Sequence, residues 1–204
     1  PGACQTAPCT SPYYYEEDNW VDDMELAAVM QYIINSKNKY MNDAVEYGRQ
    51  EPVTPWMGAD SAHHYQWYPF YNLGHLLLAD SDNDKVRKEF TRNVRSGLQR
   101  VAERGENNAF YNGIPFIWCS NNLTVAMVTQ AMLYRKITND NQFREMETSM
   151  RDWLFGVNPW GKCMIVGLPV DGDYPRDPHS ALSNLNQIQV TGGLVDGPVY
   201  CNIF

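Results

Sequence analysis

The chain has 204 residues, a formal net charge of −8 and a hydrophobic share of 44%. This length and apolar content suit one domain, or a large part of one, with a packed core. The negative charge repels phosphate backbones, so nucleic acid is not an expected partner. Because no apolar run approaches the roughly 20 residues that a bilayer requires, no membrane span is predicted.

Residues 1–18 show no helical periodicity and are expected to form a loop-like start. They contain Cys4 and Cys9, which could pair in an oxidising compartment, and the odd total of five cysteines leaves at least one free thiol. No second ligand pair for zinc accompanies them. The aromatic share of 13% fits either a surface that binds sugar rings or a core that buries many Tyr and Trp, and composition does not separate the two.

Helical periodicity dominates residues 19–156. Helices that are apolar almost all round alternate with helices that carry a narrow apolar stripe. The first kind is buried on most sides and the second faces solvent, so three hairpins in two layers are predicted. An open solenoid or a closed toroid would satisfy this pattern, and the uneven hairpin lengths favour the toroid. The broad helices are expected at 19–35, 64–79 and 121–137, and the narrow ones at 39–49, 84–104 and 141–155.

Three tryptophans each lie at or just before the start of a broad helix. Hairpin connectivity makes the broad helices parallel, so Trp20, Trp67 and Trp118 are expected at one end of the barrel. They would form an aromatic rim there, or else fill the ends of the core.

Acidic residues gather around the first helix, including Asp22, Asp23 and Glu25. Carboxylates at a helix start interact favourably with its dipole. An acid/base pair for glycoside cleavage needs carboxyl groups roughly 5–9 Å apart. Because Asp22 and Asp23 point in different directions from a helix, the structural interpretation is favoured.

Two further patterns suggest metal sites but are interpreted as structural. The run from Asp80 to Asp84 lacks the glycine and glutamate of a calcium loop, and Asp82 or Asp84 is expected to cap the next helix. The histidines at 63, 64 and 75 have no carboxylate or cysteine in an obvious ligand register. No metal and no cofactor are predicted.

Periodicity stops at Gly156, and the following residues are rich in Gly, Pro, Asp and Asn. A loop of this length is usually functional. It contains Tyr174-Pro-Arg-Asp-Pro-His179, in which His179 could donate to sugar hydroxyls. Residues 157–204 are therefore interpreted as a long functional loop and, from Pro198, the start of a further helix, where the chain looks truncated.

Several segments resemble glycoside hydrolase family 9, in the family's order across nearly the whole chain. Glu16-Glu-Asp-Asn-Trp-Val-Asp-Asp-Met-Glu-Leu-Ala-Ala28 resembles the opening of a barrel helix, and Asp152-Trp-Leu-Phe-Gly-Val-Asn-Pro159 resembles the family's D-x-L-x-G-x-N-P ending. Residues 161–179 resemble its G…PxxPH active-site loop, so the resemblance implies that the loop in 157–204 belongs to the active site. Gly192-Gly-Leu-Val-Asp-Gly-Pro198 resembles its GxLVGGP turn.

The resemblance implies an all-α (α/α)6 barrel, incomplete in this chain, with residues 1–204 forming part of a single catalytic domain. It implies a secreted or periplasmic enzyme that cleaves β-1,4-glucan (cellulose, xyloglucan or mixed-linkage glucan) with inversion. The family's D-A-G-D and N-E motifs, which supply the catalytic Asp and Glu, do not occur here. They are expected before Pro1 and after Phe204, so the chain alone is predicted to be inactive and its partner to be the rest of its own domain.

The resemblance also assigns substrate-binding residues. His179 matches the histidine of the family's P-H-x-R signature, but Ala181 stands in place of the arginine, which puts contacts to the neighbouring sugar in doubt. Trp67 and Trp118 match aromatic platforms, and Trp20 matches less closely. Two other classes stay open: a carbohydrate-binding or scaffold protein on a degenerate barrel, and a helical-repeat interaction protein.

Overall fold

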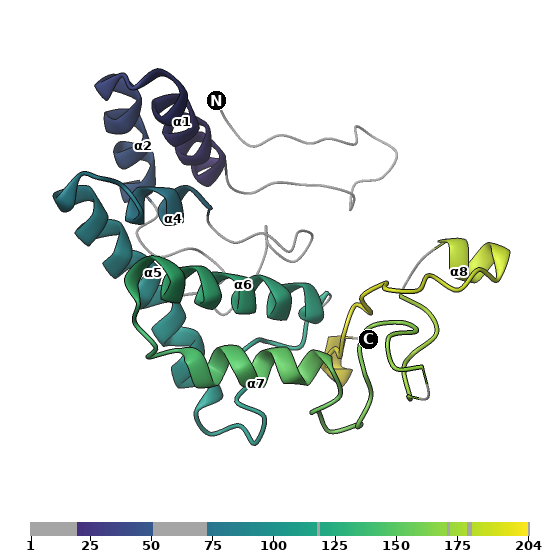
Figure 1. Ribbon diagram of the computed structural model, residues 1–204. Helices are drawn as coiled ribbons and strands as arrows, with labels where there is room; N and C mark the ends of the chain where they lie inside the picture. The colour runs from purple at the N-terminus through teal and green to yellow at the C-terminus, as the bar shows by residue number, and fades with distance from the viewer. Residues whose placement is uncertain (1–19, 51–72, 118, 171, 179–180, 204) are drawn as a thin grey trace.

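The computed structural model describes residues 20–50, 73–117, 119–170, 172–178 and 181–203 (Figure 1). In this part of the chain the only pairing of extended backbone is an antiparallel bridge between Ile165 and Leu194. The predicted all-α class is confirmed. The helices are α1 (Val21–Asn35), α2 (Asn38–Gln50), α4 (Leu73–Ala79), α5 (Asp84–Gly105), α6 (Ser120–Thr138), α7 (Arg144–Leu154), α8 (Ala181–Asn186) and the 3-10 helix η2 (Cys201–Ile203).

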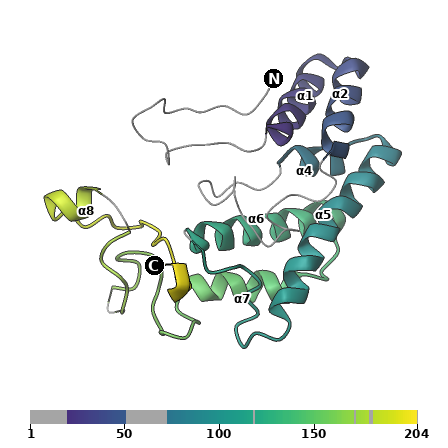
Figure 2. The ribbon, with the colours of Figure 1, turned by 180° about the vertical axis from the view of Figure 1, so that it is seen from behind.

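The helices form hairpins in two layers. α1 packs against α2, α4 against α5 and α6 against α7, while α1 also contacts α4 and α4 contacts α6. Helices α1, α4 and α6 therefore form one layer and their partners the other. Seen from both sides, the hairpins follow one another along an arc (Figures 1 and 2). The predicted pairing of broad and narrow helices is confirmed where the structure describes it.

Two of the three buried apolar clusters in the described residues lie between the helices of the arc. One lies between α1, α2, α4 and α5 and includes the fully buried Phe90 and Leu78. The other joins α5, α6 and α7 through Leu98, Met127 and Met146, each with 0% exposure. The stripes of the narrow helices point into these clusters, as their periodicity predicts.

The two longest broad helices differ in burial. α6 has nine buried residues, whereas α1 buries only Glu25, Ala28 and Val29. On α1, Met30, Ile33 and Ile34 are 42%, 55% and 69% exposed. Burial on most sides is thus correct for α6 and wrong for α1. The reason is that α2 and α4 cover only one face of α1 among the described residues.

A different residue from those expected caps α5. Asn83 has extended backbone (φ −78°, ψ 105°), and its Oδ1 accepts from the backbone N–H groups of Lys85 (3.1 Å) and Val86 (3.3 Å). The prediction of Asp82 or Asp84 as the cap was wrong. Asp84 is already the first helical residue, and only the residue directly before it can reach the free N–H groups of the first turn.

One acid of the N-terminal cluster is buried in a polar pair. Nδ1 of His75 lies 2.7 Å from both carboxylate oxygens of Glu25, and these side chains are each 1% exposed. Gly48 and Gly74 leave room for the pair, since an added Cβ at either would come within 2.8 Å of Glu25. His75 is thus a hydrogen-bonded structural histidine, as expected. The described residues hold no group of three or more His, Cys, Asp or Glu that could bind a metal.

Candidate functional site

The structure places one of the four predicted binding residues. Trp67, Trp118 and His179 lie outside the described residues. Trp20 directly precedes α1, is partly buried, and meets the ring of Tyr47 on α2 edge to face, with centroids 6.2 Å apart. Helices α1, α4 and α6 all begin on the same side of the arc (Figure 1). The aromatic rim itself stays a prediction.

The turn after α7 is organised by Asn158 of the predicted G-x-N-P motif. Its Nδ2 donates to the carbonyls of Trp153 (2.8 Å) and Lys162 (2.7 Å), and its Oδ1 accepts from the backbone N–H of Trp160 (3.2 Å). Asn158 as a whole is only 6% exposed. An amide supplies both the donors and the acceptor that this turn needs, which explains why Asn stands here.

The long loop is closed at its base by backbone hydrogen bonds. The N–H of Val166 donates to Gly193 (2.9 Å), the N–H of Gly192 donates back to Val166 (2.8 Å), and the N–H of Val195 donates to Met164 (2.9 Å). The intervening residues, 167–191, form an excursion from this base. They include position 179 and the short helix α8.

The end of this base docks onto the start of α6. The backbone N–H of Asn121 donates to Asp196 (2.9 Å), its Nδ2 donates to Val195 (2.9 Å), and Ser120 Oγ donates to Pro198 (2.8 Å). Gly197 lies between these contacts with φ +102°, and a Cβ there would come within 2.4 Å of Ser120 Oγ. Only glycine fits this backbone and this close approach.

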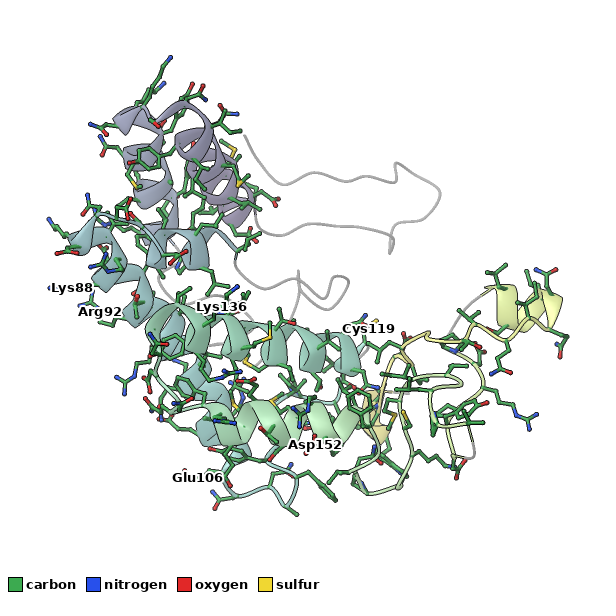
Figure 3. All side chains as sticks on the ribbon, viewed as in Figure 1. Lys88, Arg92, Glu106, Cys119, Lys136 and Asp152 are labelled. Atoms are coloured by element: carbon green, nitrogen blue, oxygen red, sulfur yellow. The ribbon has the colours of Figure 1, made fainter. Side chains whose placement is uncertain are left out.

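This docking brings two distant segments of the chain together at the start of α6. The loop that carries position 179 is anchored to the same helix start that follows position 118 in the sequence. Cys119, labelled in Figure 3, lies at that start. The contact joins residues more than 70 positions apart, so no local sequence pattern could have shown it.

A cavity of about 500 Å³, the loop pocket, lies within the excursion. It is mostly polar, and the Nε2 of Gln189 donates to the hydroxyl of Tyr174 at 3.2 Å. Amide, hydroxyl and guanidinium groups together suit a ligand rich in hydroxyls. Sequence reasoning noted Tyr174 but missed the two glutamines, because only the fold of the loop brings them to it. The lining residues are Tyr174, Arg176, Asp177, Ser183, Gln187, Ile188 and Gln189.

The surroundings of Cys119 disfavour the thiolate form of its side chain. Burial, aided by the nearby Asp196 carboxylate, raises the pKa of its thiol to about 11. A nucleophilic or metal-binding cysteine needs a lowered pKa. Cys163 and Cys201 are also free, and Cys4 and Cys9, which were expected to be able to pair, lie outside the described residues.

Among the described helices, none combines the length and apolar character that crossing a bilayer requires.

Comparisons with known proteins agree with this fold. A metagenome-derived glycoside hydrolase family 9 endoglucanase is 21% identical over 90% of this chain and 33% of its own, with a TM-score of 0.70. Bacteroides ovatus GH9 is 20% identical over 91% of this chain and 34% of its own, with a TM-score of 0.67. The family 9 endoglucanase J30 is 14% identical over 88% of this chain and 43% of its own, with a TM-score of 0.55.

These structures share the (α/α)6 barrel, of which this chain holds the hairpins described above. The chain spans about a third of the length of the first two. No curated protein matches it. The profile of glycosyl hydrolase family 9 matches residues 2–202. The chain therefore belongs to glycosyl hydrolase family 9.

Proposed function

We propose that the protein containing this chain is a secreted or periplasmic enzyme that cleaves β-1,4-glucan with inversion of configuration. Trp67 and Trp118 stack on glucosyl rings, with Trp20 as a further platform. His179 donates to the sugar beside the cleaved bond. The candidate substrates are cellulose, xyloglucan and mixed-linkage glucan.

The docking of the loop base onto α6 is the observation that carries this proposal. It supports placing Trp118 near the base of the loop that carries His179, because Ser120 and Asn121, which follow position 118, hydrogen-bond to the chain between Val195 and Pro198 at that base. The polar loop pocket adds hydrogen-bonding groups on either side of position 179 in the sequence. Aromatic faces with a few fixed polar groups are a common design for ligand sites.

The catalytic carboxylates are proposed to lie outside residues 1–204. Inverting hydrolysis needs one carboxyl group to activate water and another, roughly 6.5–9.5 Å away, to protonate the leaving oxygen. Glu25 is fully buried against His75 and cannot reach a sugar. The sequence contains neither the D-A-G-D nor the N-E motif of the family.

Hydrolysis by two gene products tests the enzyme proposal. The 204-residue chain and the product of the complete open reading frame around it are incubated with each glucan, and reducing ends are measured. The longer product is expected to release them and the chain alone is not. NMR of the sugar that is released first should show that the configuration at its anomeric carbon is inverted. Release by the chain alone, or retention of configuration, would contradict the proposal.

Retention in a gel that contains glucan separates binding from catalysis. Trp118→Ala and His179→Ala are expected to weaken retention of the longer product, while Val170→Ala, at a 94% exposed position in the same loop region, leaves it unchanged. If the longer product is held back by the glucan gel but does not hydrolyse glucan, a carbohydrate-binding or scaffold protein is favoured. Absence of both would favour a helical-repeat interaction protein.

A further inference from the structure

A second cavity, the Arg104 pocket, lies between the connection from α5 to α6 and Tyr200. Its volume is about 320 Å³, near the lower end of the range for small-molecule sites. It shares no lining residue with the loop pocket. Glu106, labelled in Figure 3, marks the start of the connection that forms one wall. The walls include Arg104, Asn108, Asn112, Phe116 and Tyr200.

Asn112, one of the residues that line this pocket, carries a buried amide donor. The residue is 4% exposed, and its Oδ1 accepts from the backbone N–H of Ile114 at 2.9 Å. That bond fixes the amide orientation, because the opposite flip would set an NH₂ group against an N–H donor. The Nδ2 is buried and has no hydrogen-bond partner in the structure. A buried donor of this kind costs free energy unless something accepts its proton.

The same wall is held rigidly. Arg104 Nε donates to the carbonyl of Gly113 at 2.9 Å, and Asn108 Nδ2 donates to the carbonyl of Asn112 at 3.3 Å. Gly113 lies so close to α5 that an added Cβ would come within 2.0 Å of the carbonyl oxygen of Val101. The guanidinium and the amides are thus positioned before any ligand arrives, which lowers the entropic cost of binding.

Two aromatic rings also line the pocket. Phe116 and Tyr200 have centroids 5.5 Å apart, and the backbone N–H of Tyr200 donates to Phe116 at 2.7 Å. Phe116 stacks in turn on the buried Trp153, with centroids 5.6 Å apart. Tyr200 is 51% exposed, so part of its ring is open to a ligand. The backing by Phe116 and Trp153 keeps this ring in place.

We propose that the Arg104 pocket binds a single neutral pyranose unit. The apolar C–H face of the sugar lies on the Tyr200 ring, and one of its hydroxyl oxygens accepts from Asn112 Nδ2. Arg104 and Asn108 bind further hydroxyls. The choice of a sugar, rather than another small polyol, rests on the function proposed above. The pocket is an accessory subsite, formed by residues other than the predicted tryptophans and His179.

The side-chain amide of Asn112 provides a direct test that needs no variant. In ¹H–¹⁵N spectra of the 204-residue chain, titration with methyl β-D-glucopyranoside is expected to shift the Asn112 NH₂ pair in a saturable way. Unmoved Asn112 signals at saturating glucoside would overturn the proposal. A shift caused by glucuronate or sulfate but not by the glucoside would also overturn it, because it would assign the pocket to anions.

Paired variants test the two walls. Asn112→Asp keeps the acceptor for Ile114 but removes the NH₂ donor, and Tyr200→Ala removes the ring. Each is expected to weaken glucoside binding about tenfold. Asn107→Asp makes the same chemical change at an exposed position of the same connection, and Phe155→Ala removes a similarly exposed ring that lines neither pocket. Both controls should bind as the unaltered chain does, and equal binding by all four variants would contradict the assignment.

The two proposals can fail independently. If the longer gene product hydrolyses glucan while Asn112 never responds to the glucoside, only the subsite proposal fails. If Asn112 responds but no glucan is cleaved, the enzyme proposal fails and the pocket remains a sugar site. Far-UV circular dichroism of each variant checks that its fold is kept.

Discussion

The α6 region and the α1 region are stabilised in different ways. α6 is enclosed by α5, α7, α4 and the base of the long loop, and its core positions are fully buried. α1 has packing on one face only and adds polar contacts, of which the Glu25–His75 pair is the most buried. Helices with similar apolar patterns can therefore differ in what holds them, because the pattern does not report how many neighbours surround the helix.

Methionine truncation gives the largest expected contrast between the two helices. Met127 on α6 has 0% exposure, whereas Met30 on α1 is 42% exposed. Met127→Ala should lower the free energy of unfolding by about 3 kcal/mol, because it leaves a cavity in close-packed surroundings. Met30→Ala should change it by less than about 0.5 kcal/mol. Urea titration followed by circular dichroism measures both, and equal losses would refute the contrast.

Glycine substitution tests the docking of the loop on α6. Gly197→Ala is expected to cost about 2–3 kcal/mol, since it combines a left-handed backbone with a clash against Ser120. Gly192 has φ +85° but no atom within 4 Å of an added Cβ. Gly192→Ala should therefore cost only the conformational part, about 1 kcal/mol. Thermal unfolding monitored at 222 nm compares the two variants, and similar losses would mean that the close contact is unimportant.

The helices could be predicted because their apolar positions recur at the helical period. The narrow stripe of α5, with Val86, Phe90 and Val94, specified both the helix and its buried face. The residue that caps the N-terminus of α5 was harder to predict, since Asp82, Asn83 and Asp84 are all good capping residues and the choice depends on where the first turn begins. Periodicity fixes such a boundary only to within a few residues.

The candidate site was less accessible to sequence reasoning. The G-x-N-P and GxLVGGP motifs located the loop and its ends, but the docking of Gly197 on Ser120 joins distant segments. No sequence pattern indicated the Arg104 pocket either, because the fold alone brings Tyr200 into contact with Phe116. Sites built from long-range contacts follow from the fold, and local patterns do not encode them.

Removing the N-terminal cap of α5, which lies on the side of the molecule nearer α1, should lower the free energy of unfolding moderately. Asn83→Ala is expected to lower the free energy of unfolding by about 1 kcal/mol, because two N–H groups lose their acceptor. Asp82→Ala, one residue earlier and exposed, should change it by less than about 0.5 kcal/mol. Chemical denaturation measures both values. A larger loss for Asp82→Ala would restore the original assignment of the cap.

The ion pair between α2 and α5 should give the smallest effect. Arg49 donates through Nε (2.7 Å) and a terminal nitrogen (2.8 Å) to the two carboxylate oxygens of Glu89. The arginine side chain is 52% exposed, so solvent screens the pair. A double-mutant cycle with Arg49→Ala and Glu89→Ala should give a coupling of only about 0.3–1 kcal/mol at neutral pH.

The pH dependence of that coupling has a definite sign. The hydrogen bonds from Arg49 hold the pKa of Glu89 below its ordinary value. A carboxyl group whose pKa is lowered by folding stabilises the folded state above its unfolded pKa of about 4.3, and this contribution is lost as the pH falls. The coupling should therefore be present at pH 7 and shrink towards pH 3. A coupling that stayed the same down to pH 3 would show that packing of the two side chains, and not their charges, joins α2 to α5.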